Sequence, residues 1–188
     1  LQRRVDRALV ARGIEGDAAS VIAAYRRHRP GATNADVWAA VGNDTTFRVP
    51  MAAMLDAHVA GGGTAWSYHF AHPSTAFEGA VGAAHAVEIP FVFDNVDQPG
   101  TELILGPMTD ERRGLSSELA DRWVAFAAAD DPAAELTVPG SGDPWPHYES
   151  GSRHQVRIDV SSEVVARWED DLRELWQSGG SSSGGSSS

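Results

Sequence analysis

The sequence contains no cysteine and no lysine: all 15 of its basic residues are arginine, and they stand against 26 acidic residues for a net charge of −11. Without cysteine there are no disulfides, no thiolate zinc sites and no cysteine nucleophile. An acidic surface lacks the basic face on which nucleic-acid binding depends, and it is not attracted to anionic membranes. No apolar run approaches the ~20 residues of a transmembrane helix. We therefore expect neither nucleic acid nor a membrane as a partner.

The length of 188 residues allows one domain, or a piece of a larger one, at roughly 150 residues per domain. Residues 178–188, SGGSSSGGSSS, have no charged or apolar side chain with which to offset their ordering entropy. We assign residues 1–177 to the folded portion and 178–188 to a flexible Gly/Ser linker or tag. An expression spacer is the favoured interpretation of the tail, and a joint in a fusion or circular permutant is the alternative.

Helical patterns dominate the first sixty residues. Apolar residues follow helical spacing over residues 1–11, and Asp17 is placed to cap a second helix. Thr33 and Asp36 have the spacing of a capping box, which predicts the start of a third helix. Residues 49–60 predict a further helix that ends at a run of three glycines.

The hydrophobic period then changes. Aromatic residues alternate over residues 64–70, and apolar residues alternate over 156–160, so each segment predicts a strand. Helices before and between two strands indicate the α/β class. Because two strands are too few for the sheet that these helices should cover, we expect the chain to be incomplete.

Two more helices are predicted in the second half. One spans residues 115–129 with Ser116 as its cap, and the other starts at Ser161 and runs to Trp176. Residues 94–107 are predicted to be a loop. The first of these helices is expected to direct its apolar residues inward: Leu119, Trp123, Val124 and Phe126.

Most of the seven histidines give no specific signal. The spacing of His69 and His72 is that of a metal-binding pair, but residues three apart on a strand point to opposite faces, and a zinc site needs a third ligand. We therefore assign no metal. Polar surface roles are the favoured interpretation of His28 and His58, and the remaining loop histidines have no spaced partner: His147 and His154.

His85 has a different setting. Small residues at positions 79–84 precede it and leave room for a substrate to approach the backbone, while an apolar run follows at 89–93. A histidine on a small-residue loop anchored by buried apolar residues suits a general base. On this pattern alone a buried structural histidine is the favoured interpretation, and catalysis is the alternative.

Residues 82–93, GAAHAVEIPFVF, resemble the catalytic-histidine segment of the type-B carboxylesterases, a family that includes bacterial para-nitrobenzyl esterases and the cholinesterases. Further segments resemble the same family, and they occur in the family's order: residues 44–50, 64–74, 120–132 and 144–148. The resemblance implies the C-terminal part of an α/β-hydrolase fold, with helices on a mostly parallel sheet. It also implies hydrolysis of small-molecule esters by a Ser/Glu/His triad, without a cofactor.

The resemblance implies roles for three residues of this chain. His85 matches the triad histidine, which takes the proton of the serine and returns it to the leaving alcohol. Glu88 matches a glutamate that supports the loop from outside the triad, and Val87 matches a position beside the substrate.

The rest of the triad is missing from the sequence. No Gly-x-Ser-x-Gly elbow occurs in residues 1–177, where Ser141, Ser150 and Ser152 have the wrong neighbours. We therefore expect the serine, the acid and the oxyanion hole to come from a missing N-terminal portion, in the same fusion or in a separate chain. Alone, the chain should be inactive and poorly soluble. Its localisation stays open, because any signal peptide would precede Leu1.

Two other functions fit the sequence less well. One is a non-catalytic binding protein with a hydrolase fold, which would have no chemical need for His85 in its loop. The other is a free-standing helical module in which all these features are core packing. The oligomeric state and the ester substrate are not predicted.

Overall fold

The computed structural model describes residues 1–130 and 136–177 of the chain. They form two compact units: a helical unit, made of Leu1–Gly62 with the described residues from Arg167 onward, and a sheet unit, Gly63–Ala166. The assignment of residues 1–177 to one folded portion stays a prediction. The predicted linker, 178–188, lies outside the described residues.

Three helices open the helical unit: α1 (Gln2–Ala11), α2 (Ala18–His28) and α3 (Asn34–Asn43). Both predicted caps are confirmed. The Asp17 carboxylate accepts hydrogen bonds from the backbone N–H groups of Ala19 and Ser20, and Thr33 and Asp36 form a reciprocal capping box. These caps satisfy backbone donors that have no partner within the first turn of a helix.

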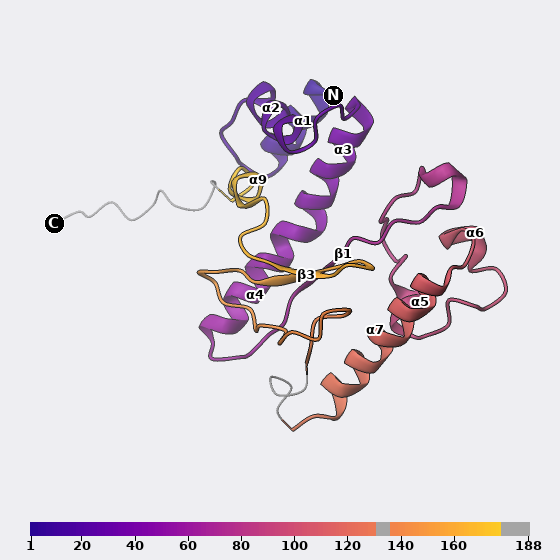
Figure 1. The fold of residues 1–188 in the computed structure, drawn as a ribbon. Coiled ribbons are helices and arrows are strands. Elements are labelled where there is room, and N and C mark those ends of the chain that lie inside the picture. Colours follow the sequence, from indigo (N-terminus) through magenta and orange to yellow (C-terminus); the bar gives the residue numbers. More distant parts are fainter. Residues whose placement is uncertain (131–135, 178–188) are drawn as a thin grey trace. The chain divides into compact units, whose positions relative to one another are not determined.

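The third helix is longer than the sequence predicts. After α3 the chain passes through one π-helical turn, η1 (Asp44–Arg48), directly into α4 (Val49–Ala60), so the three segments form one continuous rod (Figure 1). Pro50 follows this turn and has no N–H to donate, so it falls where the regular i to i−4 bonding is already interrupted.

The helical unit has a largely apolar core that includes Val5, Leu9 and Val37, and α9 (Asp170–Glu174) contributes Leu172 to it. A polar network lies beside these residues. Asp44 is 3% exposed and accepts hydrogen bonds from the Tyr25 hydroxyl and from the Arg48 guanidinium. The network therefore links α2 to the π-helical turn.

In the described residues of the sheet unit, three strands form a sheet in the order β1-β2-β3: β1 (Tyr68–Phe70), β2 (Gln155–Ile158) and β3 (Glu163–Val165). The first two are parallel, with Tyr68 opposite Val156, and β3 is antiparallel to β2. The crossover between these parallel strands includes the helices α5 (Ile89–Val92), α6 (Glu102–Leu105) and α7 (Asp110–Ala128).

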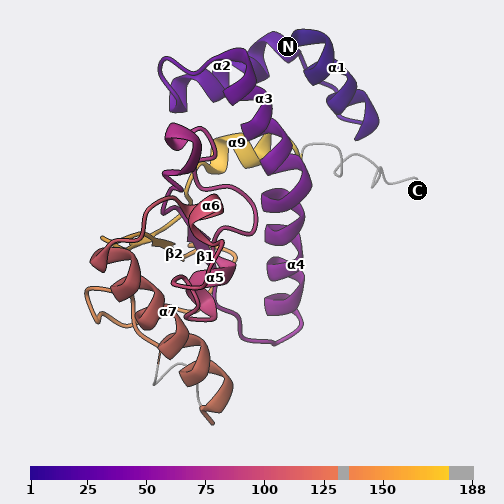
Figure 2. The same ribbon diagram turned by 90° about the vertical axis from the view of Figure 1, so that its right-hand side faces the viewer.

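The core of the sheet unit lies between α5, α7 and the strands, and Figure 2 shows α5 beside α7 and close to β1 and β2. Buried residues from α5, α7 and β2 meet there: Phe91, Leu115, Leu119, Val156 and Ile158. No described helix is long and apolar enough to cross a bilayer.

The prediction for α7 was wrong at its start. The helix begins at Asp110, not Leu115, because the Thr109 hydroxyl accepts the N–H of Arg112 and two acidic residues favour the first turn. Ser116 lies fully buried inside the helix. Val124 and Phe126, predicted to point inward, are 66% and 48% exposed.

The last predicted helix was also wrong over most of its length. Residues Glu163–Val165 form β3, and the helix is confined to α9. Ser162 turns the chain back by accepting the N–H of Asp159, and positive φ angles at Arg167 and Glu169 keep a helix from continuing through them. The count of two strands thus becomes three, and the predicted loop 94–107 contains the short helix α6.

Candidate active site

His85 lies in the loop between η2 (Ala76–Gly79) and α5, and its side chain is exposed. The favoured interpretation from spacing alone, a buried structural histidine, was therefore wrong. Ala86, the next residue, has a φ of 71°, a left-handed conformation that is uncommon for a residue with a side chain. Such backbone persists only where the surroundings hold it, and it is frequent at active sites.

The loop is held on both sides of His85. Before it, the carbonyl oxygen of Gly82 accepts the N–H of Ser74 at 3.0 Å. After it, Val87 and Phe91 are each 1% exposed in the core of the sheet unit. On α7, the hydroxyl of Ser116 donates to the carbonyl oxygen of Phe91 at 3.2 Å. An exposed imidazole on a turn that is fixed on both sides is suited to proton transfer.

The other two predicted site residues lie beside the same turn. Glu88 is half-buried directly before α5. Burial, with a smaller effect from the nearby Glu88 carboxylate, raises the pKa of the Tyr68 hydroxyl above its usual value. Val87 directs its side chain into the core. Its role beside a substrate, like that of Glu88 in supporting the loop, stays a prediction.

A second histidine has the carboxylate partner typical of a catalytic base, but both of its nitrogens are in use. His72 Nδ1 lies 2.8 Å from Asp159 Oδ1, and its Nε2 accepts the Nε–H of Arg112 at 3.2 Å. Because Nε2 is the acceptor for the guanidinium, it is not available to a substrate or a nucleophile. His72 therefore has a structural role in this arrangement.

The sequence alone gives no sign of this cluster. Asp159 and Arg112 lie 87 and 40 residues from His72 in the chain, so no local spacing signals their contact. His69 and His72, to which no metal was assigned, do not belong to a larger ligand set: residues 1–130 and 136–177 contain no group of three or more His, Asp or Glu side chains that could hold a metal ion.

The remaining histidines make surface or local contacts. His28 pairs with Asp171 at 2.9 Å, in line with its predicted polar role. His147 is exposed beside Glu149 at 3.3 Å. His154 Nδ1 lies 3.1 Å from the Ser152 hydroxyl, but this serine sits in a turn before β2 and not between a strand and a helix.

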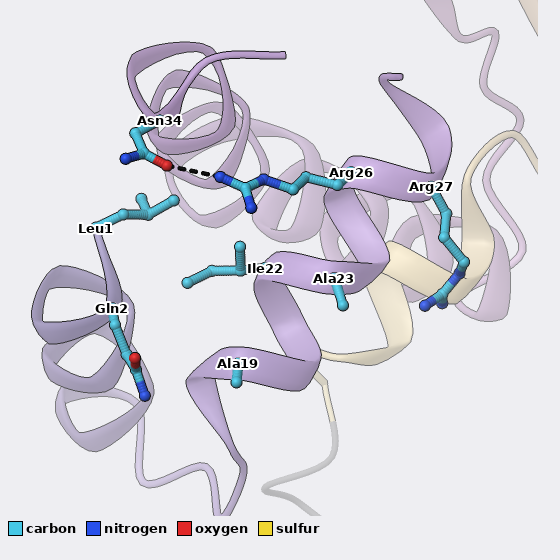
Figure 3. A pocket seen from close by; sticks show the side chains of 8 residues that line it. All are labelled: Leu1, Gln2, Ala19, Ile22, Ala23, Arg26, Arg27 and Asn34. Carbon is cyan, nitrogen blue, oxygen red and sulfur yellow. Dashed lines mark hydrogen bonds between the residues drawn. The ribbon is translucent and has the colours of Figure 1, made fainter. Parts of the chain in front are cut away.

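His85 is not among the lining residues of two hollows found on the described residues, one on each unit. The larger, about 670 Å³, lies on the helical unit, with apolar residues such as Ile22 on α2 and the guanidinium of Arg26 held by Asn34 (Figure 3). Its lining side chains include no hydroxyl, imidazole or carboxylate group. The smaller, about 160 Å³, lies on the sheet unit and has a largely aromatic lining: Trp66, Tyr68, Trp123, Phe126 and Trp145.

Comparison with known proteins identifies the family. The model of the Carboxylesterase family matches residues 13–174. The chain belongs to the carboxylesterase family. This confirms the type-B carboxylesterase resemblance found in the sequence. The para-nitrobenzyl esterase of Bacillus subtilis is 33% identical over 93 residues, covering 49% of this chain and 17% of that protein. Human carboxylesterase 5A is 26% identical over 140 residues, which cover 72% of this chain and 23% of that protein.

Solved carboxylesterase structures confirm the fold. The Geobacillus stearothermophilus carboxylesterase EST55 matches with a TM-score of 0.71 and 26% identity, over 92% of this chain and 34% of that one. A thermophilic para-nitrobenzyl esterase matches with a TM-score of 0.68 and 23% identity, over 94% of this chain and 33% of that one. The chain thus has part of an α/β-hydrolase fold, and it spans about a third of these structures and about a fifth of the curated relatives.

Proposed function

We propose that this chain supplies the general base, His85, of a serine carboxylesterase. The observation that carries the proposal is the exposed imidazole of His85. It lies on a turn that contacts on both sides hold in place and in which Ala86 has a left-handed backbone, and the chain belongs to the carboxylesterase family. His72, the competing histidine of the sheet unit, has both nitrogens engaged.

In this mechanism His85 takes the hydroxyl proton of a serine as its oxygen attacks the ester carbonyl carbon. The imidazolium then gives that proton to the leaving alcohol oxygen as the ester C–O bond breaks, which leaves an acyl-serine. In the second half His85 takes a proton from water as the water oxygen attacks the acyl carbon, and it returns this proton to the serine as the acid leaves.

The two neighbours of His85 have supporting roles in the proposal. Glu88, half-buried at the start of α5, stabilises the loop and does not serve as the triad acid. Val87 is proposed to lie beside the ester through its position two residues after His85, while its side chain packs in the core. No step requires a cofactor.

The serine, the acid and the oxyanion hole are proposed to come from the N-terminal portion of the same esterase, in one polypeptide or in a separate chain. The sheet unit has a surface for such a partner. Within the described sheet β1 is an edge strand, and Tyr68 on β1 and Phe126 on α7 are 39% and 48% exposed around the aromatic hollow. An unpaired edge beside exposed aromatic side chains favours pairing with another segment.

The test uses the native protein that contains this chain, whose intact mass first shows whether another chain accompanies it. Hydrolysis of a short-chain nitrophenyl ester is measured for the unaltered protein, His85→Ala and the exposed control His147→Ala. Loss of the triad histidine should lower kcat on the order of 10⁴-fold or more, and the control should not. Undiminished hydrolysis by His85→Ala contradicts the proposal.

A second readout separates catalysis from binding. A fluorophosphonate probe reacts covalently with an activated serine, so the native protein should be labelled and His85→Ala should be labelled much more slowly. A protein that is well folded and contains the N-terminal portion, yet is not labelled, would instead support a non-catalytic hydrolase-like binding protein. Ser152→Ala should leave labelling unchanged, because Ser152 is not the proposed nucleophile.

A further inference from the structure

Arg112 is a buried arginine whose hydrogen-bonding capacity is fully used. It projects from the first turns of α7 and is 4% exposed. A guanidinium has five N–H donors. The side chain makes five hydrogen bonds at 2.7–3.2 Å, and their acceptors come from separate parts of the sheet unit: His72 Nε2, Leu105 O, Pro107 O, Pro73 O and Thr75 Oγ1.

These acceptors tie two segments to α7. The segment that follows β1 supplies the acceptors at positions 72, 73 and 75, and the segment at the end of α6 and just beyond it supplies the carbonyl oxygens of Leu105 and Pro107. Through His72 the arginine also reaches Asp159, directly after β2. The carboxylate holds the proton of the neutral imidazole on Nδ1, and this leaves Nε2 as the acceptor for Arg112.

The same segment holds the loop of His85. Ser74, between two acceptors of Arg112, donates its N–H to Gly82, three residues before His85. On the other side, the ring of His72 packs edge-on against Phe91 with centroids 5.7 Å apart. Val87, His72 and Arg112 line one small gap in the interior. Arg112 therefore contacts the supports on both sides of the His85 turn.

We propose that Arg112, oriented by His72 and Asp159, is the positioning residue that holds the His85 loop in place. This inference rests on the proposed role of His85 as the general base. Lysine could not replace Arg112, because an ammonium has three donors on a single nitrogen and cannot reach acceptors spread around a planar fork. Arg112 touches neither the substrate nor the reacting atoms, so its effect on catalysis is indirect.

The first test measures the loop without using activity. Hydrogen exchange of peptides that cover residues 72–78 and 80–88 is compared for the native protein, Arg112→Met and Arg113→Met. Arg113 is the matched control, because it is the adjacent arginine of α7 but pairs with Asp97 at the surface. Arg112→Met should raise exchange in both peptides at least about tenfold, and Arg113→Met should not. Unchanged exchange in a folded Arg112→Met protein overturns the inference.

A second pair of variants keeps the test informative if Arg112→Met fails to fold. In His72→Gln a side-chain oxygen can still accept from Arg112 and the amide can still donate to Asp159, whereas His72→Leu can do neither. Exchange over residues 80–88 should rise in His72→Leu and stay near the native rate in His72→Gln. Equal exchange in the two variants contradicts the proposed linkage.

The final readout is kinetic, again on the native protein. If the loop is mispositioned, Arg112→Lys should lower kcat for a nitrophenyl ester at least tenfold with KM nearly unchanged, because substrate binding is kept and proton transfer is impaired. Faster loop exchange together with an unchanged kcat would refute the role of Arg112 in positioning a base. An active His85→Ala protein, by contrast, would refute the proposed function and leave the exchange result standing.

Discussion

His72 Nδ1 lies 2.8 Å from Asp159 Oδ1, although the two residues are separated by 87 positions in the sequence. This histidine–carboxylate pair has the partner arrangement of a catalytic dyad, yet the second ring nitrogen accepts a hydrogen bond from Arg112. His85, in the same unit, is exposed on a strained turn. The exposure of His85 and the part-buried contacts of His72 therefore separate a candidate base from a structural histidine.

Chemical modification should distinguish these two histidines. Diethyl pyrocarbonate reacts with unprotonated imidazole nitrogens, and mass spectrometry of the digested protein locates the adducts. His85 should be modified faster than His72 by about an order of magnitude, because both nitrogens of His72 are hydrogen-bonded and its side chain is 12% exposed. His147, which is exposed, provides a reference rate. Faster modification of His72 than of His85 would contradict the assignment.

The caps of the first helices predict how stability depends on pH. Hydrogen bonds from the N-terminal turns lower the pKa of Asp17 and of Asp36 from the usual value of 3.8. Because each folded pKa lies below the unfolded one, the stabilisation is fully present above about pH 4 and is lost as the pH falls through the folded pKa. The free energy of unfolding, measured by urea denaturation, should therefore fall less steeply between pH 5 and pH 2 in Asp17→Asn than in the native protein. An equally steep fall in this variant would show that the Asp17 cap does not contribute to the dependence of stability on pH.

Local signals in the sequence predicted these helix starts correctly. The Asp17 cap and the Thr33 capping box each depend on residues within three positions of one another, so spacing alone is enough to find them. The family resemblance predicted the fold class for a similar reason, because its motifs are contiguous segments of the chain.

Features that depend on distant partners could not be predicted in this way. The valines of β3 have apolar spacing that is compatible with a helix, and only pairing with β2 makes them a strand. Ser116 has the residue type of a cap, but its hydroxyl bonds Phe91, 25 residues away. The same limit applies to the site. His85 lies in a recognisable segment, whereas the contacts of Arg112 with His72 and Leu105 exist only in the folded chain.

The buried network of the helical unit should be essential for stability. Asp44 accepts from Tyr25 and from two nitrogens of Arg48, so Asp44→Ala leaves the guanidinium without its main counter-charge, although Glu169 lies 3.8 Å away. We expect a loss of about 3 kcal/mol in the free energy of unfolding, measured by urea denaturation. The exposed Asp6 on α1 provides the control, and Asp6→Ala should stay within about 0.5 kcal/mol of the native protein. Equal effects of the two substitutions would show that the network does not stabilise the fold.

Exposed aromatic side chains of the sheet unit should control the solubility of the isolated chain. Phe126 is 48% exposed beside Trp66, with ring centroids 5.6 Å apart. Phe126→Gln should increase the soluble yield of the chain expressed alone and weaken its association with an N-terminal portion, because the same apolar surface drives both processes. Leu103, also exposed but on α6, is the control: Leu103→Gln should leave that association unchanged. A sharp, cooperative thermal unfolding of the unaltered isolated chain would contradict the incomplete-fold interpretation.

Two glycines of the sheet unit should respond to alanine in opposite ways. Gly106 has a φ of 80°, and a Cβ atom there would lie 2.3 Å from Thr75 Oγ1 and 2.8 Å from the backbone nitrogen of Ala76. Gly106→Ala should therefore destabilise the protein by more than about 1 kcal/mol and increase hydrogen exchange over residues 72–78. Gly114 lies within α7 with nothing within 4 Å of such a Cβ, so Gly114→Ala should stabilise the protein by about 0.5–1 kcal/mol. A neutral Gly106→Ala would mean that the chain after α6 does not rest against Thr75, and that the contacts of Arg112 with both segments do not persist in solution.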